Sequence, residues 1–308
     1  MSERSARRHL LSADDLAVGD IERVLETARG FEAVADREVK SVPALRGRTV
    51  MNVFFESSTR TSSSFELAAK RLSADTLSFR SSGSSVEKGE SLKDTLLTLD
   101  AYRPDVVVLR HAHAGAAALA TRYTRAAVVN AGDGKHAHPT QALLDLFTIR
   151  ARFGRIEGLH VAIVGDVLHS RVARSNIALL TRMGASVGVI APPTLVPREI
   201  EALGVTVSHE IADLAAADVV YVLRLQRERM AEGEAFVPSL REYTARFGVS
   251  SARLREGQAV MHPGPMNRGV EISDEVADAA GSLIAAQVAS GLVVRMAVLY
   301  DLLAESAA

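Results

Sequence analysis

The sequence lacks cysteine and tryptophan among its 308 residues. Without cysteine, disulfide bonds, thiolate catalysis and cysteine-based zinc sites are excluded. The absence of tryptophan excludes no class of function. An excess of charge of one sign is also missing, because the formal net charge is −1 and no long run of one sign occurs. We therefore expect neither a nucleic acid nor a membrane surface as a partner.

Segments that would direct the chain to a membrane are also missing. Residues 1–12 are polar and basic without an apolar stretch, unlike a secretory signal peptide. The most apolar segment, 282–304, is interrupted by Gln287, Arg295 and Asp301. A membrane-spanning helix of about 20 residues rarely carries such side chains. We therefore expect an amphipathic helix packed on a protein core, and a cytoplasmic protein.

The chain has a composition and length typical of a two-domain globular protein. Hydrophobic residues make up 47% and charged residues 24%, and domains usually hold roughly 100–200 residues. No internal repeat or low-complexity tract is present. Apolar strands are expected at 50–55, 105–109, 126–130, 160–164, 187–190, 205–207, 219–223 and 259–261.

Helical patterns alternate with these strands. Ser12 and Asp15 form a capping-box pattern, and the apolar residues behind it recur at helical spacing. A second helix is expected to begin near Ser58, a long linking helix to span 141–152 and a closing helix to lie near 285–304. The alternation predicts the α/β class, with two doubly wound parallel sheets in two domains.

The segment from Phe54 to Thr61 reads FFESSTRT, where a strand ends and a helix begins on hydroxyl residues and one arginine. Helix N-termini expose unpaired N–H groups and carry positive partial charge, so this segment is suited to a phosphate. The alternative is an ordinary N-cap followed by a surface arginine.

Two polar segments follow. Residues 82–90, SGSSVEKGE, form a small-residue loop whose lysine can meet an anion, although a solvated loop is the more common meaning of such a composition. Residues 136–141, HAHPTQ, place two histidines before a helix. No third ligand cluster follows, so a metal site is not expected, and a histidine here is suited to donate to a carbonyl oxygen.

Three motifs follow strands in the second half of the chain. Residues 165–171, GDVLHSR, lack the GxGxxG pattern of dinucleotide-binding sites, and their arginine is suited to a carboxylate. Residues 223–226, LRLQ, lie at a strand end, where ligands of open α/β sheets bind. Residues 261–269, MHPGPMNRG, form a stiff turn whose carbonyls can accept from an amide. For each arginine the alternative is a surface ion pair.

Taken together and in this order, these segments resemble the aspartate carbamoyltransferase family, whose catalytic subunit belongs to the aspartate/ornithine carbamoyltransferase superfamily. The resemblance runs from about Leu11 to Leu303. Its most specific segments are FFESSTRTSSSFELAAKRL, SSVEKGESLKDT, VNAGDGKHAHPTQALLDLFTI and MHPGPMNRGVEI.

The resemblance implies a carbamoyl-phosphate-binding domain at 1–137 plus 289–308 and an aspartate-binding domain at 138–288, with the active site in the cleft between them and at a subunit interface. It implies that carbamoyl phosphate is bound by Ser58, Thr59, Arg60, Thr61, Ser84, Lys88, Arg110, His138, Gln141, Gly264 and Pro265. L-aspartate would be bound by Lys88, Arg171, Arg224 and Gln226. The catalytic groups would be Arg60, Thr61, Lys88, Arg110 and His138.

The resemblance further implies a homotrimer, because the loop with Ser84 and Lys88 enters a neighbouring subunit's site in this family. Regulatory or dihydroorotase chains are possible further partners. The implied reaction is an early step of pyrimidine (UMP) biosynthesis and uses no cofactor or metal. Two positions depart from the family: Ser57 stands where proline is usual, and Gly264 where many members have leucine.

Three other functions compete with that of an aspartate carbamoyltransferase. An ornithine carbamoyltransferase shares the STRT and HPTQ elements but typically carries a cysteine in the turn that reads HPGP here. A nicotinamide-dependent dehydrogenase is disfavoured by the missing glycine fingerprint. A non-catalytic homologue is expected to have lost anion-binding residues, but every anion-binding residue that the resemblance implies is present in this sequence.

Overall fold

The computed structural model describes residues 9–35, 37–81, 89–226 and 236–304. It divides into unit 1, Met1–Leu144 with Ala289–Ala308, and unit 2, Asp145–Val288. The boundaries fall within two helices, α5 (Pro139–Phe153) and α9 (Ile284–Ala304). The chain therefore passes from one unit to the other within a helix at both boundaries.

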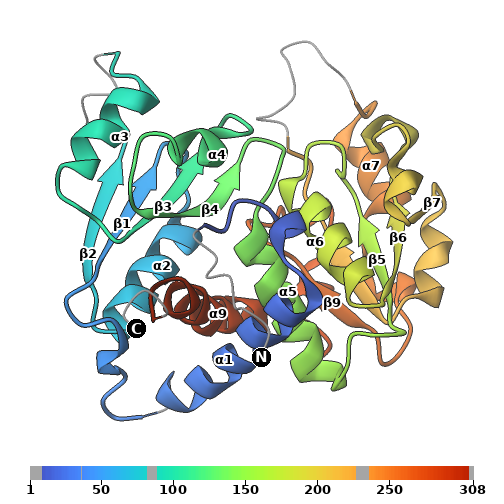
Figure 1. The fold of residues 1–308 in the computed structure, drawn as a ribbon. Coiled ribbons are helices and arrows are strands. Elements are labelled where there is room, and N and C mark those ends of the chain that lie inside the picture. The colour runs from blue at the N-terminus through green and yellow to red at the C-terminus, as the bar shows by residue number, and fades with distance from the viewer. Residues whose placement is uncertain (1–8, 36, 82–88, 227–235, 305–308) are drawn as a thin grey trace. The chain divides into compact units, whose positions relative to one another are not determined.

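Unit 1 contains a parallel sheet in the order β2-β1-β3-β4 (Figure 1). Its strands are β1 (Thr49–Phe54), β2 (Asp75–Arg80), β3 (Val106–His111) and β4 (Ala127–Asp133). Its helices are α1 (Val18–Ala35), α2 (Thr59–Arg71), α3 (Leu92–Asp100) and α4 (Ala116–Ala120), with 3-10 turns at Ala13–Asp15 and Pro43–Leu45.

The sheet of unit 1 is covered on both faces because its central strands are apolar on both faces. Met51 and Val107 pack with residues of α3 and α4 in one cluster. Phe65 of α2, which is fully buried, lies under the guanidinium of Arg295 of α9, 5.1 Å from ring centroid to Cζ. The apolar face of the helix that begins after Ser58 consists of Phe65, Ala68 and Ala69, followed by Leu72, and is buried.

Unit 2 contains a parallel sheet in the order β7-β6-β5-β8-β9. Its strands are β5 (His160–Val164), β6 (Ser186–Ile190), β7 (Thr206–Ser208), β8 (Val219–Val222) and β9 (Ala259–Met261). Its helices are α6 (Arg171–Arg182), α7 (Leu240–Phe247) and α8 (Asp274–Ala277), with 3-10 turns at Pro193–Leu195, Ile200–Leu203, Ile211–Ala216 and Ser251–Arg253. Two parallel α/β sheets confirm the predicted fold class.

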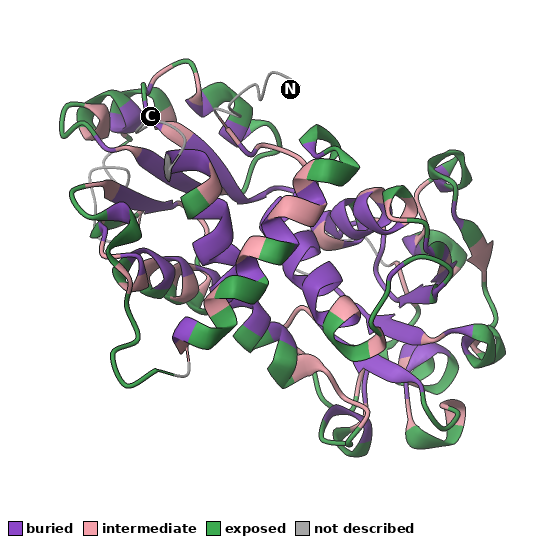
Figure 2. Ribbon diagram, turned by 60° about the horizontal axis from the view of Figure 1, so that its bottom comes forward, coloured by how far each residue is buried: buried purple, intermediate pink, exposed green. Residues whose placement is uncertain are grey.

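The closing helix α9 is largely buried. Buried residues, purple in Figure 2, also make up most of the strands. Its segment Ile284–Leu303 is long and apolar enough to cross a membrane, but 67% of it lies inside the structure. Core helices of globular proteins have the same apolar character. The expected packing of this segment on a core is confirmed.

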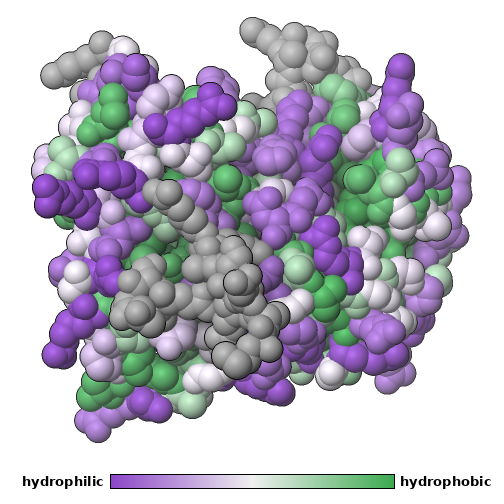
Figure 3. Space-filling view, in the orientation of Figure 1, coloured by the Kyte–Doolittle hydropathy of each residue, from purple (hydrophilic) through white to green (hydrophobic). Residues whose placement is uncertain are grey.

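The surface is mixed in polarity. On the face drawn in Figure 3, hydrophilic residues predominate and hydrophobic residues form small groups. Exposed apolar side chains include Leu67 on α2 and Leu77 on β2, at 43% and 49% of their full exposure. Scattered apolar residues are normal on globular surfaces, but these two lie on elements that contact each other.

Candidate active site

Most of the described residues expected to bind carbamoyl phosphate lie at one edge of the sheet of unit 1. In a parallel sheet all carboxyl ends meet at the same edge, where ligands of α/β proteins bind. The segment Ser58–Thr61 follows β1, Arg110 lies in β3, and His138 and Gln141 follow β4. Because β1, β3 and β4 are neighbours in the sheet, the fold brings these residues to the same edge.

The helix α2 begins in this edge with Ser58 as its N-cap residue, in an extended conformation with φ −159°. Its hydroxyl makes no capping hydrogen bond, so the positive end of the helix is not satisfied by its own N-cap side chain. Thr59 and Arg60 are exposed, whereas Thr61 is buried. A helix N-terminus of this kind is suited to an anion, and the phosphate site stays a prediction.

Arg110 is fixed by neighbours on both sides. Its Nη2 donates to Oε1 of Glu56 at 2.9 Å and its Nη1 to the carbonyl of Ala131 at 3.2 Å. Its own carbonyl accepts from the N–H of Phe55 at 2.9 Å. The guanidinium is therefore oriented by groups that follow β1 and lie in β4. No sequence pattern marks Glu56 for this role.

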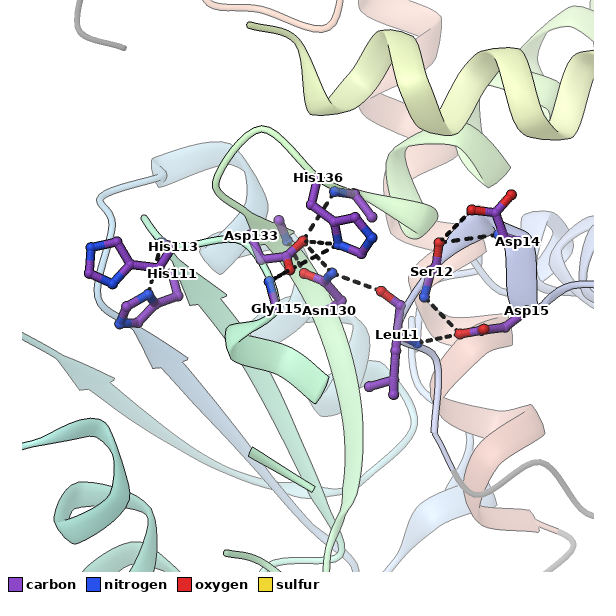
Figure 4. Close-up of polar contacts among 12 residues, drawn as sticks. Leu11, Ser12, Asp14, Asp15, His111, His113, Gly115, Asn130, Asp133 and His136 are labelled. Carbon is purple, nitrogen blue, oxygen red and sulfur yellow. Dashed lines mark hydrogen bonds and ion pairs between the residues drawn. The ribbon is translucent and has the colours of Figure 1, made fainter. Parts of the chain in front are cut away.

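Asp133, at the end of β4, is buried and accepts several hydrogen bonds (Figure 4). One oxygen accepts from Nδ2 of Asn130 at 2.7 Å and the N–H of Ala137 at 3.1 Å; the other accepts from the N–H of Gly115 at 2.7 Å. Nδ1 of His136 lies 3.1–3.2 Å from both oxygens. Asp133 thus fixes the turn that leads into His138.

His138 and Gln141 lie where that turn enters α5. Both are buried, with 4% and 8% of their full exposure, and the N–H of Gln141 donates to the carbonyl of His138 at 3.0 Å. The neighbouring His136 pairs with Asp133 instead of joining a ligand set, and the described residues hold no group of three or more histidine and carboxylate side chains that could bind a metal.

His111, beside Arg110, has a lowered pKa because it is partly buried and faces His113. Its Nδ1 accepts from the N–H of His113 at 3.0 Å, and Figure 4 shows the two rings together. Both causes disfavour the imidazolium form. This histidine is therefore neutral over a wider pH range than an exposed one.

Residues expected to bind aspartate lie at the carboxyl edge of the sheet of unit 2. Arg171 follows β5 and is the first residue of α6, and Arg224 and Gln226 follow β8. The turn with Gly264 and Pro265, which were expected to bind carbamoyl phosphate, follows β9 of the same sheet. Because β5, β8 and β9 are neighbours in the sheet, these residues share one edge. Arg171 is buried to 2% of its full exposure.

Asp166 connects two of these loops and is fully buried. Its Oδ1 accepts from the backbone N–H of His169 at 3.1 Å and lies 2.8 Å from that ring's Nδ1. Its Oδ2 accepts from the N–H of Gln226 at 2.9 Å. The carboxylate therefore fixes the backbone of Gln226 relative to the loop before α6.

Gly165 allows the loops after β5 and β8 to approach each other closely. Its φ of +114° is a conformation that side chains rarely adopt, and a Cβ added there would lie 2.5 Å from the carbonyl oxygen of Leu223. Arg224, which follows Leu223, is half-buried, and its Nη1 donates to the carbonyl of Leu225 at 3.3 Å.

The turn after β9 has Gly264 in a left-handed conformation, with φ +64°. A glycine adopts this conformation without the steric cost that a leucine would meet, which gives a physical reason for glycine here. The departure at Ser57 lies on an exposed residue just before the N-cap of α2. The expected site residues Ser84 and Lys88 lie outside the described residues.

Two family models match the chain. The carbamoyl-P binding domain of aspartate/ornithine carbamoyltransferases matches residues 8–151, and the Asp/Orn binding domain of the same family matches residues 157–302. The chain belongs to the aspartate/ornithine carbamoyltransferase family.

Individual members of this carbamoyltransferase family match over nearly the whole chain. Aspartate carbamoyltransferase catalytic subunits of Frankia casuarinae and Salinispora arenicola are 58% and 56% identical, and the matches cover 97% and 96% of this chain and 95% and 98% of theirs. An aspartate transcarbamoylase from Trypanosoma cruzi, in complex with N-(phosphonacetyl)-L-aspartic acid, is 33% identical with a TM-score of 0.86, covering 96% of each chain.

Proposed function

We propose that this carbamoyltransferase moves the carbamoyl group of carbamoyl phosphate to the α-amino group of L-aspartate, giving N-carbamoyl-L-aspartate and phosphate. This reaction is an early step of pyrimidine biosynthesis. The observation that carries the proposal is the identity of 53–58% to aspartate carbamoyltransferase catalytic subunits over nearly the full chain. The arrangement of anion-binding groups at both sheet edges supports it.

We assign carbamoyl phosphate to the edge of unit 1. The N-terminus of α2, with the hydroxyls of Ser58, Thr59 and Thr61, would hold the phosphate. Arg110 and His138 would reach the carbonyl oxygen, together with Thr61, and Gln141 would lie against the carbamoyl group. The ion pair between Arg110 and Glu56 supports this role because it keeps the guanidinium in one orientation.

We assign L-aspartate to the edge of unit 2. Arg171, Arg224 and Gln226 would bind its two carboxylates, because guanidinium groups pair with carboxylates in a bidentate manner. At the same edge, the carbonyls of Gly264 and Pro265 would accept from the amide nitrogen of carbamoyl phosphate. An aspartate transcarbamoylase solved with carbamoyl phosphate and aspartate is 33% identical to this chain and has a TM-score of 0.87.

Under this proposal the neutral amine of aspartate attacks the carbamoyl carbon directly. A C–N bond forms, the bond from carbon to the phosphate oxygen breaks, and the departing phosphate takes the amine proton. Arg110, His138 and Thr61 would stabilise the oxyanion, and one such donor is typically worth about 10²–10³ in rate. Arg60 and Lys88 would offset charge on the leaving phosphate. No covalent nucleophile, cofactor or metal is required, because carbamoyl phosphate is already activated.

For assembly we propose a homotrimer in which the loop with Ser84 and Lys88 completes a neighbouring subunit's site. The exposed Leu67 and Leu77, on contacting elements of unit 1, support a subunit contact there. Regulatory or dihydroorotase chains and a cytoplasmic location belong to the same proposal. We also propose domains at 1–137 plus 289–308 and at 138–288.

The substrate assignment is tested by assaying the purified chain with carbamoyl phosphate and either L-aspartate or L-ornithine, with its mass measured in solution. We expect carbamoyl-aspartate and a trimer mass. Carbamoylation of ornithine in preference to aspartate would favour the rival substrate, and no product with either amino acid would refute the activity.

Shared sites are tested by mixing subunits. Arg60→Ala and Lys88→Ala proteins should each be inactive, but hybrid trimers should recover part of the activity because some sites receive neither substitution. Hybrids are verified by native mass spectrometry with a mass tag on one parent. Verified hybrids that remain inactive would show that each site is built by a single chain.

A further inference from the structure

The side chain of His262 lies in the turn after β9 and has no role in the reaction described above. It is buried to 2% of its full exposure, directly before the turn with Gly264 and Pro265. Its Nδ1 accepts a hydrogen bond from the N–H of Gly264 at 2.8 Å. Its Nε2 lies 3.3 Å from Oε1 of Glu271, which is also buried. Each ring nitrogen therefore has its own partner.

These contacts define the tautomer of the ring. A backbone N–H is always a donor, so Nδ1 must present a lone pair to Gly264 and cannot carry a proton. The proton of the neutral ring then lies on Nε2, where it donates to the carboxylate of Glu271. Protonation of Nδ1 would turn this acceptor into a second donor facing the N–H of Gly264.

Glu271 holds the other end of the same turn. Its Oε1 also accepts from the backbone N–H of Asn267, and its own carbonyl accepts from the N–H of Val249 at 2.9 Å. Residues 262–267 are thus held at the start by the imidazole of His262 and at the end by the carboxylate of Glu271. Gly264 lies between these two attachment points.

The backbone of His262 is itself anchored to the core of unit 2. Its N–H donates to Oε1 of Gln287 at 2.9 Å, and Nε2 of Gln287 donates to Oδ1 of Asp145 at 2.8 Å. Oδ2 of Asp145 accepts from the hydroxyl of Tyr221 at 2.6 Å and from Nδ2 of Asn176 at 2.8 Å. These groups are buried and belong to α5, α6, α9 and β8. The backbone position from which the imidazole extends is therefore fixed.

We propose that His262 is a positioning residue, whose Nδ1 lone pair sets the direction of the Gly264 and Pro265 carbonyls that receive substrate nitrogen. The inference rests on the proposed function, because that function gives the two carbonyls their substrate. A glycine in a left-handed conformation is intrinsically free to adopt others, so a hydrogen bond to its N–H is what selects one orientation. His262 itself does not contact substrate.

The test compares three variants that separate the two ring nitrogens. His262→Asn offers an amide oxygen near the place of Nδ1 but does not reach Glu271. His262→Gln offers an amide nitrogen near the place of Nε2 but no acceptor for Gly264. His262→Leu fills space only. We expect kcat/KM with carbamoyl phosphate and L-aspartate to fall about 10- to 100-fold in the leucine and glutamine variants, since a misplacement of about 1 Å has such an effect.

The asparagine variant should retain most of the wild-type kcat/KM, while its melting temperature falls because Glu271 loses a buried donor. The glutamine variant should be more stable than the asparagine variant, because it keeps a donor for Glu271, but its kcat/KM should be lower. A purely structural role would make activity and melting temperature fall in parallel. An asparagine variant as impaired as the leucine variant, or a glutamine variant as active as wild type, would overturn the inference.

Wild-type protein assayed in parallel separates the two proposals. An inactive wild type refutes the proposed function, whereas an active wild type with the wrong order of variants refutes only the role of His262. A spectrum of 15N-histidine-labelled wild type tests the tautomer without reference to activity. We expect the His262 signals, identified by their loss in whichever variant folds, to show protonated Nε2 and bare Nδ1, and protonated Nδ1 would overturn the inference.

Discussion

The two sheet edges that carry the candidate site are built differently. In unit 1 the groups expected to hold the phosphate lie at the N-terminus of α2, where Thr59 and Arg60 are exposed and the hydroxyl of Ser58 makes no capping bond. The turn that leads into His138, at the same edge, is held by the buried carboxylate of Asp133. In unit 2 the corresponding edge is organised by carboxylates buried beneath it. Asp166 and Glu271 have 0% and 1% of their full exposure, and each lies against a buried histidine.

The difference follows from how each edge holds its groups. A helix N-terminus presents several N–H groups on a rigid element without further support. Loops after strands have no such element, so their N–H groups need buried acceptors to fix them. Substitutions at the N-terminus of α2 should therefore reduce activity more than stability, and substitutions of the buried carboxylates beneath the edge of unit 2 should reduce both.

The largest expected effect is that of Arg60→Ala in unit 1. Removing a charge that stabilises the leaving phosphate should lower kcat by about 10²–10³, with little change in melting temperature because the side chain is exposed. Product formation at fixed times measures kcat, and thermal denaturation measures the melting temperature. Arg122→Ala, at another exposed arginine of unit 1, is the control. Near-normal kcat in Arg60→Ala would remove this residue from the phosphate site.

An intermediate effect is expected for Asp166→Asn in unit 2. The amide cannot accept all the N–H groups that Asp166 accepts, so at least one buried donor is left unpaired, at a cost of about 1–3 kcal/mol. The KM for aspartate should rise as well, because the backbone of Gln226 loses its acceptor.

Urea denaturation and initial-rate kinetics check both changes, with Glu201→Gln at an exposed position as the control. If Asp166→Asn raised the KM for aspartate without lowering stability, the two edges would differ less than we infer.

The smallest effect concerns pH and His111 in unit 1. Its pKa is lowered below 6.5 by burial and by His113. The unfolded chain therefore binds more protons than the folded one between the two pKa values. The contribution to stability is present above pH 6.5 and is lost as pH falls through the lower, folded-state pKa.

His111→Asn keeps an acceptor for the N–H of His113 but does not titrate, so its unfolding free energy should decline less between pH 7.5 and 5.5 (roughly, one pH unit either side of the ordinary histidine pKa) than that of wild type. His160→Asn, at an exposed histidine of unit 2, should follow wild type. A slope in His111→Asn as steep as that of wild type would contradict the assignment.

Much of the fold could be predicted from local sequence patterns. The bounds expected for β5 and β9 agree with the structure, and the other predicted strands lie within a few residues of their observed ends. These strands are continuous apolar runs because they are covered on both faces. The edge strand β2 was not predicted, since most of its residues are exposed and no apolar run marks it. The helices α3, α4, α7 and α8 were also not predicted.

The positions of site residues on loops could be predicted in part. That Arg224 and Gln226 follow a strand was visible in the sequence, because ligand-binding residues of α/β sheets follow strands. The supporting residues Glu56, Asp133 and Asp166 were not predicted, and neither was the pair of His262 and Glu271. Some of their partners are distant in sequence, such as Arg110 for Glu56, or are backbone groups. The side-chain partners nearby in sequence, such as His136 for Asp133 and His169 for Asp166, follow no periodic pattern that would mark them. The signal that could have indicated these supporting residues is that each is a carboxylate or histidine within or next to a recognised motif.

The discontinuity of unit 1 has a consequence for biosynthesis. Arg23 in α1 pairs with Asp301 in α9 at 2.6 Å, 278 residues later in the chain. At roughly 5–20 residues per second of translation, the first helix waits on the order of tens of seconds for this partner. Unit 2 is one uninterrupted stretch, so a ribosome supplies all of it before it completes the body that contains the N-terminus. During that interval Arg23 of α1 lacks its partner on α9.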